Sequence, residues 1–370
     1  MKVALVCDWY HPRIGGIELH LQDLARRLIG GGHQVVGITP TPGAELVDGV
    51  RVRRIETPRA PHFGFMYTRG GVRALGDALA AERVDVAHCH VSIVSPAALG
   101  GALEAERRGI PVLLTFHSVV PQTQMLARAA GLMLGTSRWR ARFSAVSDRV
   151  ANGVRPIAGR RSLAILPNGI DVDYWRVDAR PRRGGTIELM SVMRLNAKKR
   201  PFALIDLVRR VNAILPGAER VRLRIVGDGP LRRRLERAIA NAGLGPQIEL
   251  LGYRTRDEIR ALFAESDLFV LPTVRESFGL AALEARCSGL PVVAMADSGV
   301  AEIVRHGRDG LLAQSDAELA THVSTLARDG VHRRAIAEHN RHTTPPYDWS
   351  QLVDAHVALY REAIALRQSV

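Results

Sequence analysis

Short apolar runs alternate with helical segments along this chain, and the alternation occurs twice. In the first half, the apolar runs lie at residues 3–7, 34–39, 84–90, 111–116 and 142–147. In the second half they lie at 186–192, 221–227, 248–252, 267–272 and 291–295, after a Gly-, Pro- and Arg-rich stretch at 179–185. Apolar strands that alternate with helices predict parallel sheets covered on both faces. The chain is therefore predicted to form two α/β halves of the same type.

The length of 370 residues fits two such domains of similar size. We predict a first domain at residues 1–168, a second at 169–346, and a helix in 347–370 that packs back across the junction. Each domain is expected to be an open, doubly wound, Rossmann-like sheet. Such sheets bind ligands outside the carboxyl ends of their strands, so two facing sheets predict an interdomain cleft.

The sequence gives no indication of export or membrane insertion. The first apolar run ends at Asp8 and is too short for the core of a signal peptide. No apolar run approaches the roughly 20 residues that span a bilayer. Cys7, Cys89 and Cys287 are far apart and lack metal-ligand spacing. We expect a cytosolic protein with buried thiols and without disulfides.

A formal net charge of +14 leaves three kinds of anionic partner open: nucleic acid, membrane and small molecule. Arginine supplies nearly all of this charge and is spread along helices without interleaved aromatic residues. That distribution favours a solvated basic surface over a nucleic-acid interface. Lysine occurs only as Lys2, Lys198 and Lys199. The adjacent pair indicates a place where a compact ammonium group is needed.

Two glutamates follow the strand at 267–272. Glu276 stands in the loop at the carboxyl end of the strand, and Glu284 lies further on, in an apolar helix that Gly279 can open. Free amides at a helix start suit a phosphate. Glu276 could accept hydrogen bonds from sugar hydroxyls, and Glu284 could hold a ribose diol. The alternative is that both glutamates merely favour the first half of a helix, which fits Glu284 poorly because its neighbours are apolar.

The loop after the strand at 186–192 carries Arg194, Lys198 and Lys199. A planar guanidinium and a compact ammonium on a strand-to-helix loop can clamp a diphosphate. They could neutralise it as a leaving group, a task that magnesium performs in other transferases. A solvated basic turn is the alternative. The position at the end of a strand and the rarity of lysine favour the clamp.

Glycines and histidines give weaker signals. Gly15 and Gly16 allow a ligand to approach the backbone, but a tight turn needs them too. No full dinucleotide fingerprint is present, which counts against a nicotinamide enzyme. His117 ends a strand and could hydrogen-bond a sugar hydroxyl, whereas His88 and His90 lack the nearby carboxylates or cysteines of a metal site. We predict no bound metal.

In order and content, these motifs resemble glycosyltransferase family 4, whose members have the GT-B fold. The resemblance covers almost the whole chain, through GGIELHLQDL, VDVAHCH, TFHS, LPNGID, MRLNAKKRP, LRIVGDGP, ESFGLAALEARCSGLPVVA and SGVAEIVRHGRDG. The first half is also similar to the subunit that adds N-acetylglucosamine to phosphatidylinositol and to bacterial phosphatidylinositol mannosyltransferases. The resemblance implies a retaining, metal-independent transferase that moves a hexose or N-acetylhexosamine from a UDP- or GDP-sugar and needs no cofactor.

The resemblance also implies residue roles, with the acceptor bound by the first domain and the donor by the second. Arg194 and Lys199 would bind the donor diphosphate, and Glu276 would contact the sugar hydroxyls. His117 would lie beside the transferred sugar, which completes the expected catalytic set. The further donor-binding residues that it implies are Gly15, Gly16, Phe278, Gly279, Leu280 and Glu284. Departures from the family pattern are Ser298 in place of a glycine, and the pair Cys287-Ser288.

The acceptor stays open between a lipid, a glycan and a small molecule. Residues 121–143 are apolar and then arginine-rich around Arg138, Trp139 and Arg140. They indicate either a surface that touches anionic lipid at the inner face of a membrane or an ordinary helix pair. Two other functions remain open: another GT-B enzyme, such as a nucleotide-sugar epimerase or a phosphorylase, and a basic non-catalytic protein that binds nucleic acid or membrane. A phosphorylase would need a pyridoxal-binding lysine, and none is evident. We expect no nucleic-acid partner.

Overall fold

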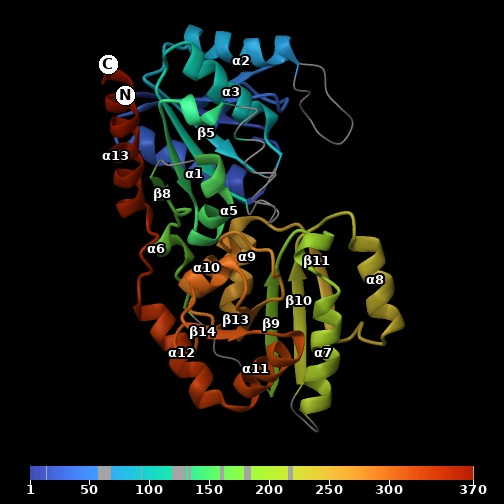
Figure 1. Cartoon of the computed structure of the whole chain (residues 1–370). Coiled ribbons are helices and arrows are strands. Elements are labelled where there is room, and N and C mark those ends of the chain that lie inside the picture. Colours follow the sequence, from blue (N-terminus) through green and yellow to red (C-terminus); the bar gives the residue numbers. More distant parts are fainter. Residues whose placement is uncertain are drawn as a thin grey trace. The chain divides into compact units, whose positions relative to one another are not determined.

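A computed structural model of the chain describes residues 1–13, 15–56, 68–92, 94–118, 131, 135–158, 162–178, 185–215 and 220–369. It divides into two compact units (Figure 1). Unit 1 comprises Met1–Gly169 and Trp349–Val370, and unit 2 comprises Ile170–Asp348. The chain therefore leaves unit 1 once and returns to it once. The observed limits, after Gly169 and after Asp348, differ by one and two residues from the predicted junctions at 168/169 and 346/347.

Within the described part of unit 1, eight strands form one sheet in the order β3-β4-β2-β1-β5-β6-β7-β8. The strands are β1 (Lys2–Cys7), β2 (Gln34–Thr39), β3 (Leu46–Val47), β4 (Val50–Arg54), β5 (Val86–Val91), β6 (Val112–Phe116), β7 (Ala141–Ala145) and β8 (Leu163–Ile165). Neighbours pair in parallel except β3 and β4. Every residue of β5 and β6 is buried, as expected for strands covered on both faces.

The helices of unit 1 cover this sheet. They are α1 (Gly16–Gly30), α2 (Arg69–Ala81), α3 (Pro96–Arg107), α5 (Asp148–Ala158) and α13 (Trp349–Gln368), with the 3-10 turn η1 (Thr136–Arg138). In Figure 1, α13 runs beside α1, and it also contacts β6 and β7. Gly169 makes this docking possible, because a Cβ atom there would lie 2.4 Å from Cδ2 of Trp349.

Within the described part of unit 2, six strands form a sheet whose pairings are all parallel, in the order β11-β10-β9-β12-β13-β14. The strands are β9 (Thr186–Val192), β10 (Arg220–Val226), β11 (Ile248–Gly252), β12 (Leu268–Leu271), β13 (Val292–Met295) and β14 (Gly310–Ala313). The helices are α6 (Val172–Trp175), α7 (Ala203–Ile214), α8 (Arg232–Asn241), α9 (Arg256–Ala264), α10 (Leu280–Cys287), α11 (Asp316–Arg328) and α12 (Gly330–His342), with η2 (Ala197–Lys199) and η3 (Gly299–Glu302).

The expectation of two parallel-sheet α/β domains is confirmed, and all ten predicted strands are present. Four further strands, β3, β4, β8 and β14, were not predicted. β4 alternates valine with arginine beside the edge strand β3, and β3 and β8 have only two and three residues. β14 has four residues, of which the three at 311–313 are apolar.

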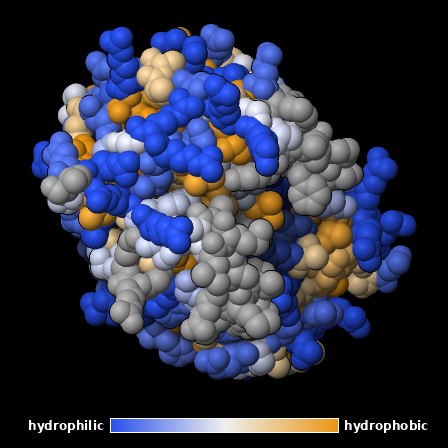
Figure 2. Space-filling view, turned by 45° about the horizontal axis from the view of Figure 1, so that its top comes forward, coloured by the Kyte–Doolittle hydropathy of each residue, from blue (hydrophilic) through white to orange (hydrophobic). Residues whose placement is uncertain are grey.

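Hydrophilic residues cover most of the face in Figure 2, with apolar residues in separate groups between them. None of the described helices is both long and apolar enough to cross a membrane. Of the segment predicted to touch lipid, residues 121–130 and 132–134 lie outside the described residues. Trp139 is buried and so does not face a membrane, whereas Arg138 and Arg140 are exposed. Arg142 is paired with Glu362 of α13 at 2.5 Å.

Candidate functional site

Two loops of unit 2 meet at the carboxyl edge of its sheet. β9 and β12 are parallel neighbours, with Leu268 opposite Leu189, so the loops that follow them adjoin. Hydrogen bonds join the loops directly: Nη1 of Arg200 donates to the carbonyl of Pro272 at 2.8 Å, and Oγ1 of Thr273 donates to the carbonyl of Lys199 at 3.2 Å. Residues far apart in the sequence are thereby fixed at one edge.

Lys199 and Glu276, both predicted site residues, form an ion pair across these loops. Nζ of Lys199 lies 2.5 Å from Oε2 of Glu276, and the two side chains are 24% and 12% exposed. The side chain of Asn196 accepts a hydrogen bond from the backbone of Lys199 at 3.1 Å and so fixes the start of η2. The amide of Ser277 donates to the other oxygen of Glu276 at 3.1 Å. A charge-assisted pair of this kind has donors and acceptors left over for a polar ligand.

The loop that carries Arg194 is shaped by the glycines at 227 and 229. The amide of Met193 donates to Val226 at 3.0 Å and that of Leu195 to Asp228 at 2.9 Å. Gly227 has a φ of 129°, and a Cβ there would lie 1.9 Å from the carbonyl oxygen of Met193. The turn at residues 227–229 thus packs against the backbone of the loop and supports it. The side chain of Arg194 itself is exposed.

Lys198 completes the basic part of this edge. Its side chain is half-buried, and burial, followed by the charge of Lys199, lowers its pKa. Burial costs a lysine its hydration, so two adjacent ammonium groups are held here at an energetic cost. A bound anion would offset that cost, so the two lysines fit an anion site.

Gly279 is the N-cap of α10, and no other residue type fits there without strain. Its φ is 100°, in the left-handed region that favours glycine, and a Cβ would lie 2.8 Å from Cγ2 of Val300. Phe278 before it is buried and packs edge-on against Tyr347, with ring centroids 5.3 Å apart. Leu280 is the first residue of α10, and Glu284 lies half-buried on the same helix.

A short 3-10 turn, η3, supports the Glu276 loop from behind, and the sequence did not predict it. The amide of Gly299 donates to the carbonyl of Glu276 at 3.0 Å, and a Cβ on Gly299 would lie 2.3 Å from the carbonyl oxygen of Ser277. Ser298, a departure from the family pattern, caps this turn through Val300 at 3.3 Å and donates to Met295 at 2.7 Å. The Ser-Gly pair was visible in the sequence, but only the fold places it against Glu276.

In unit 1, Gly15 and Gly16 begin α1. Gly15 is its N-cap in an extended conformation, and a Cβ there would lie 2.6 Å from Oε2 of Glu18. Close packing against Glu18 is therefore a structural reason for Gly15. Gly16 is exposed at the first turn of the helix, where backbone amides point outward from the helix end.

His117, predicted to contact a sugar, lies in unit 1 within a cluster of buried histidines. Its Nε2 is 2.9 Å from Nδ1 of His90, and burial lowers the pKa of His117 to about 3. His90 and His88 are neighbours on β5 with ring centroids 3.8 Å apart. The cluster, called here the histidine cluster, consists of His20, His88, His90, His117 and His356.

The histidine cluster is tied into the sheet and α13. His88 lies 2.9 Å from the hydroxyl of Tyr360 and 2.7 Å from that of Thr115. His20 and His356 were missed in the sequence because they come from helices, where nothing in the local pattern links them to β5. In the part of the chain that the structure describes, no group of three or more His, Cys, Asp or Glu side chains is arranged to hold a metal ion.

Comparisons with known proteins agree with this architecture. Residues 14–174 match the family model "Glycosyltransferase Family 4", and residues 177–343 match the model "Glycosyl transferases group 1". The chain is 28% identical to a glycogen synthase of Mycobacterium tuberculosis, over 98% of this chain and 95% of that one. It is 23% identical to a phosphatidylinositol N-acetylglucosaminyltransferase subunit of Saccharomyces cerevisiae, over 97% of this chain and 82% of the relative.

A solved structure of similar fold is the Anabaena protein HepE in complex with UDP and glucose. The two chains are 21% identical and superpose with a TM-score of 0.74, over 100% of this chain and 99% of the other. At that identity the likeness is one of fold.

Proposed function

This chain belongs to glycosyltransferase family 4, and we propose that it transfers a hexose or N-acetylhexosamine from a UDP- or GDP-sugar with retention of the anomeric configuration. The observation that carries the donor part is the Lys199–Glu276 pair, 2.5 Å apart at the carboxyl edge of unit 2. A cation beside a carboxylate suits a ligand that has a phosphate next to a sugar. The other groups on these loops support the same ligand.

In this proposal, different residues of unit 2 bind different parts of the donor. Lys199 and Arg194 bind the diphosphate and neutralise it as the glycosidic bond breaks, so that no metal ion is required. Glu276 accepts hydrogen bonds from sugar hydroxyls. Phe278, Gly279 and Leu280 line the sugar-phosphate pocket where the first amides of α10 point outward. Glu284, on the same helix, binds the ribose diol.

In unit 1 we propose that Gly16 presents backbone to the phosphate and that His117 hydrogen-bonds the transferred sugar. The low pKa of His117, about 3, keeps the ring neutral at pH 7, so it acts by hydrogen bonding and not as a charged acid. Retention then follows from attack on the same face as the leaving group, with a phosphate oxygen as base. This route needs no protein nucleophile.

The acceptor is a lipid, a glycan or a small molecule, and relatives named for glycogen and for phosphatidylinositol support this range. We propose that the exposed Arg138 and Arg140 touch anionic lipid at the inner face of a membrane. Flotation with vesicles that contain anionic lipid tests this. Charge-reversal variants of both arginines should float less than the native protein, and equal flotation would contradict membrane contact.

Calorimetric titration with UDP, GDP and ADP, with and without EDTA, tests the donor site. We expect one nucleotide to bind, EDTA to change nothing, and Arg194→Ala to weaken binding. Arg233→Ala is the matched control, because Arg233 is exposed on α8 of the same unit, outside the two loops. Failure of all three nucleotides to bind would reject the diphosphate clamp, and loss of binding in EDTA would reject metal independence.

A further inference from the structure

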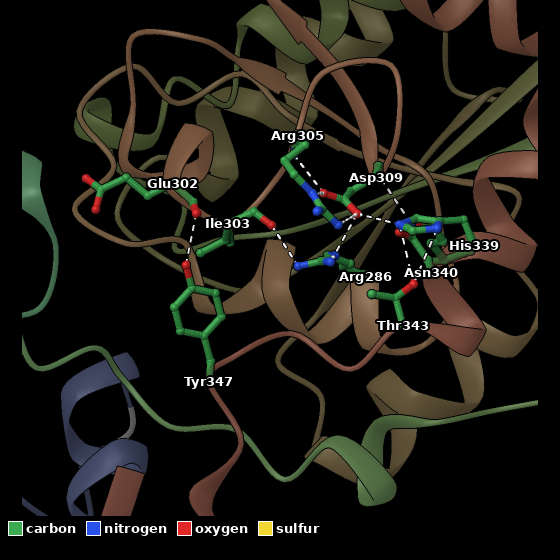
Figure 3. A network of polar contacts seen from close by, with 10 residues as sticks. Arg286, Glu302, Ile303, Arg305, Asp309, His339, Asn340, Thr343 and Tyr347 are labelled. Atoms are coloured by element: carbon green, nitrogen blue, oxygen red, sulfur yellow. Dashed lines mark hydrogen bonds and ion pairs between the residues drawn. The ribbon is translucent and has the colours of Figure 1, made fainter. Parts of the chain in front are cut away.

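A buried carboxylate, Asp309, joins three basic side chains in unit 2 (Figure 3). It is fully buried and receives Nη2 of Arg286 at 3.0 Å, Nε of Arg305 at 2.9 Å and Nε2 of His339 at 3.0 Å. Asn340 donates to the carbonyl of the same residue at 2.9 Å. Buried charges are stable only when they are paired and hydrogen-bonded. These contacts therefore hold the carboxylate of Asp309 in one position within unit 2.

Arg286 connects Asp309 to η3. The residue lies on α10 and is 4% exposed. While Nη2 binds Asp309, Nη1 donates to the carbonyl of Ile303 at 3.0 Å, as Figure 3 shows. Ile303 is the C-cap of η3. The planar fork of arginine reaches both partners at once, which a lysine cannot do.

The other end of η3 touches the Glu276 loop. Gly299 donates to the carbonyl of Glu276 at 3.0 Å, and Val300 packs against Gly279. The hydroxyl of Tyr347 also donates to the carbonyl of Glu302 at 2.9 Å, so η3 is held at its C-terminal end by two side chains. A continuous chain of contacts therefore runs from Asp309 through Arg286 and η3 to the backbone of Glu276.

We propose that Arg286 is a positioning residue for sugar recognition. By holding Ile303 it fixes η3, and η3 fixes the backbone of Glu276, so that the carboxylate is placed to meet the sugar of the donor. This inference rests on the proposed role of Glu276 in sugar binding. It assigns a donor-site function to a side chain that bonds to the C-terminal end of η3, whereas the Glu276 loop bonds to the first residue of η3.

Arg305 provides a matched control within the same network. Its side chain binds both oxygens of Asp309, at 2.9 and 3.2 Å, and is 54% exposed. Its side-chain bonds go to Asp309 and not to η3. Arg305→Met therefore removes a guanidinium from Asp309 and leaves the link to Ile303 in place, whereas Arg286→Met removes both.

The experiment compares the affinity for a nucleotide with the affinity for the same nucleotide carrying a sugar. UDP with UDP-glucose, and GDP with GDP-mannose, are titrated into the native chain, Arg286→Met and Arg305→Met. We expect Arg286→Met to bind the nucleotide within twofold of the native chain and to lose at least fivefold in the extra affinity that the sugar gives. Arg305→Met should match the native chain within twofold in both. An unchanged sugar increment in Arg286→Met, or an equal loss of nucleotide and nucleotide-sugar, would overturn the proposal.

Hydrogen exchange separates this inference from the donor proposal. The amide of Gly299, bonded to Glu276, should exchange at least fivefold faster in Arg286→Met and at the native rate in Arg305→Met. Equal protection in both variants overturns the positioning role, even where nucleotide titrations succeed. Failure of the native chain to bind any nucleotide rejects the donor site alone. If Arg286→Met does not fold, Arg286→Lys, which keeps the charge but not the fork, is measured by the same exchange and should show the same direction.

Discussion

Lys199 is one of three lysines in the chain, and the other ion-paired one offers a direct comparison. Lys199→Ala should weaken diphosphate binding by about 10- to 100-fold, since a hydrogen bond to a charged group contributes about 1.5–3 kcal/mol. Lys2→Ala is the control, because Lys2 pairs with Glu82 in unit 1 at 2.9 Å. Titration with UDP and GDP measures both. Equal affinities of Lys199→Ala and the native chain would remove Lys199 from the site.

The side chain of Asn168 predicts which nitrogen of His117 carries the proton. Among the described residues, neither Nε2 of His90 nor Nδ1 of His117 has a hydrogen-bond partner within normal geometry, so the His90–His117 contact alone does not assign the proton. Asn168 raises the pKa of His117, as an acceptor that faces the ring would. On that basis we predict that His117 carries its proton on Nδ1 and that Nδ1 of His90 donates to Nε2 of His117, at 2.9 Å.

Nitrogen-15 NMR of histidine-labelled protein at pH 7.5 reads this tautomer directly. We expect His117 to show a protonated Nδ1 and a bare Nε2, with the signal assigned by its loss in His117→Gln. His90→Asn keeps a polar group near the position of Nδ1 and should retain the tautomer, whereas His90→Leu should release it. A protonated Nε2 in the native chain would contradict the assignment and would make His117 a hydrogen-bond acceptor toward any ligand.

The sequence predicted which residues follow the carboxyl ends of strands. It did not predict the contacts of Arg286 and η3 that support the Glu276 loop. Glu276 and Lys199 each follow an apolar run, so parallel pairing brings their loops to the same edge. Arg286 lies within an apolar helix, and its partners Asp309 and Ile303 come from a loop whose position only the fold determines. A local sequence pattern does not predict contacts between residues that are far apart in the chain.

At the scale of elements, the docking of α13 depends on the missing side chain of Gly169. A Cβ there would lie within 2.6 Å of three atoms of the Trp349 ring. Gly169→Ala should destabilise unit 1 by about 1–3 kcal/mol, the usual cost of overpacking. Calorimetry should show a lower Tm, by about 2–4 °C per kcal/mol for a domain of this size, and hydrogen exchange should quicken along α13.

Gly30→Ala is the matched control for that substitution. Gly30 is the last residue of α1, and a Cβ there meets nothing within 4 Å. We expect no loss of stability, because alanine is the better helix former. A Tm loss equal in both variants would contradict the docking argument, since it would be independent of Trp349.

Elements were predictable where burial on both faces made a strand uniformly apolar. The limits of β2, β9 and β11 agree with the sequence to the residue. β4 was missed because its Val-Arg alternation gives it only one apolar face, and it lies beside the short edge strand β3. β14 (Gly310–Ala313) was missed because its apolar run, residues 311–313, is shorter than the four to eight residues that mark a buried strand.

Acid should act on unit 1 of the molecule through its histidine cluster. Burial lowers the pKa of His88, His90, His117 and His356, to about 3 for His117 and about 4 for His356. The unfolded chain takes up these protons near pH 6.5 and the folded unit does not. The free energy of unfolding therefore falls as pH drops below 6.5, by up to about 1.4 kcal/mol per pH unit for each histidine. Asp8 opposes this: burial raises its pKa to about 6, so between about pH 6 and 4 the folded unit holds a proton on Asp8 that the unfolded chain does not.

Urea unfolding between pH 7 and 5 measures the net effect. We expect unit 1 to lose stability with a slope that grows from about one proton at pH 7 to about three at pH 5, where four come from the histidines less one from Asp8. His356→Leu should reduce that slope by about one proton. A stability that is flat or rises toward pH 5 would contradict the assignment of neutral, buried histidines.

The return of α13 to unit 1 has a consequence for the order of events on the ribosome. Unit 2 is an insertion within unit 1, and its ends lie together, since Ile170 bonds to Tyr347 at 2.9 Å and bridges to Asp348. During synthesis, unit 2 emerges complete while unit 1 still lacks the helix that carries Trp349, His356 and Tyr360. β5 and β6, including His88, which bonds to Tyr360, then lack this cover until α13 has been synthesised. Unit 1, whose synthesis begins first, is therefore completed only after unit 2.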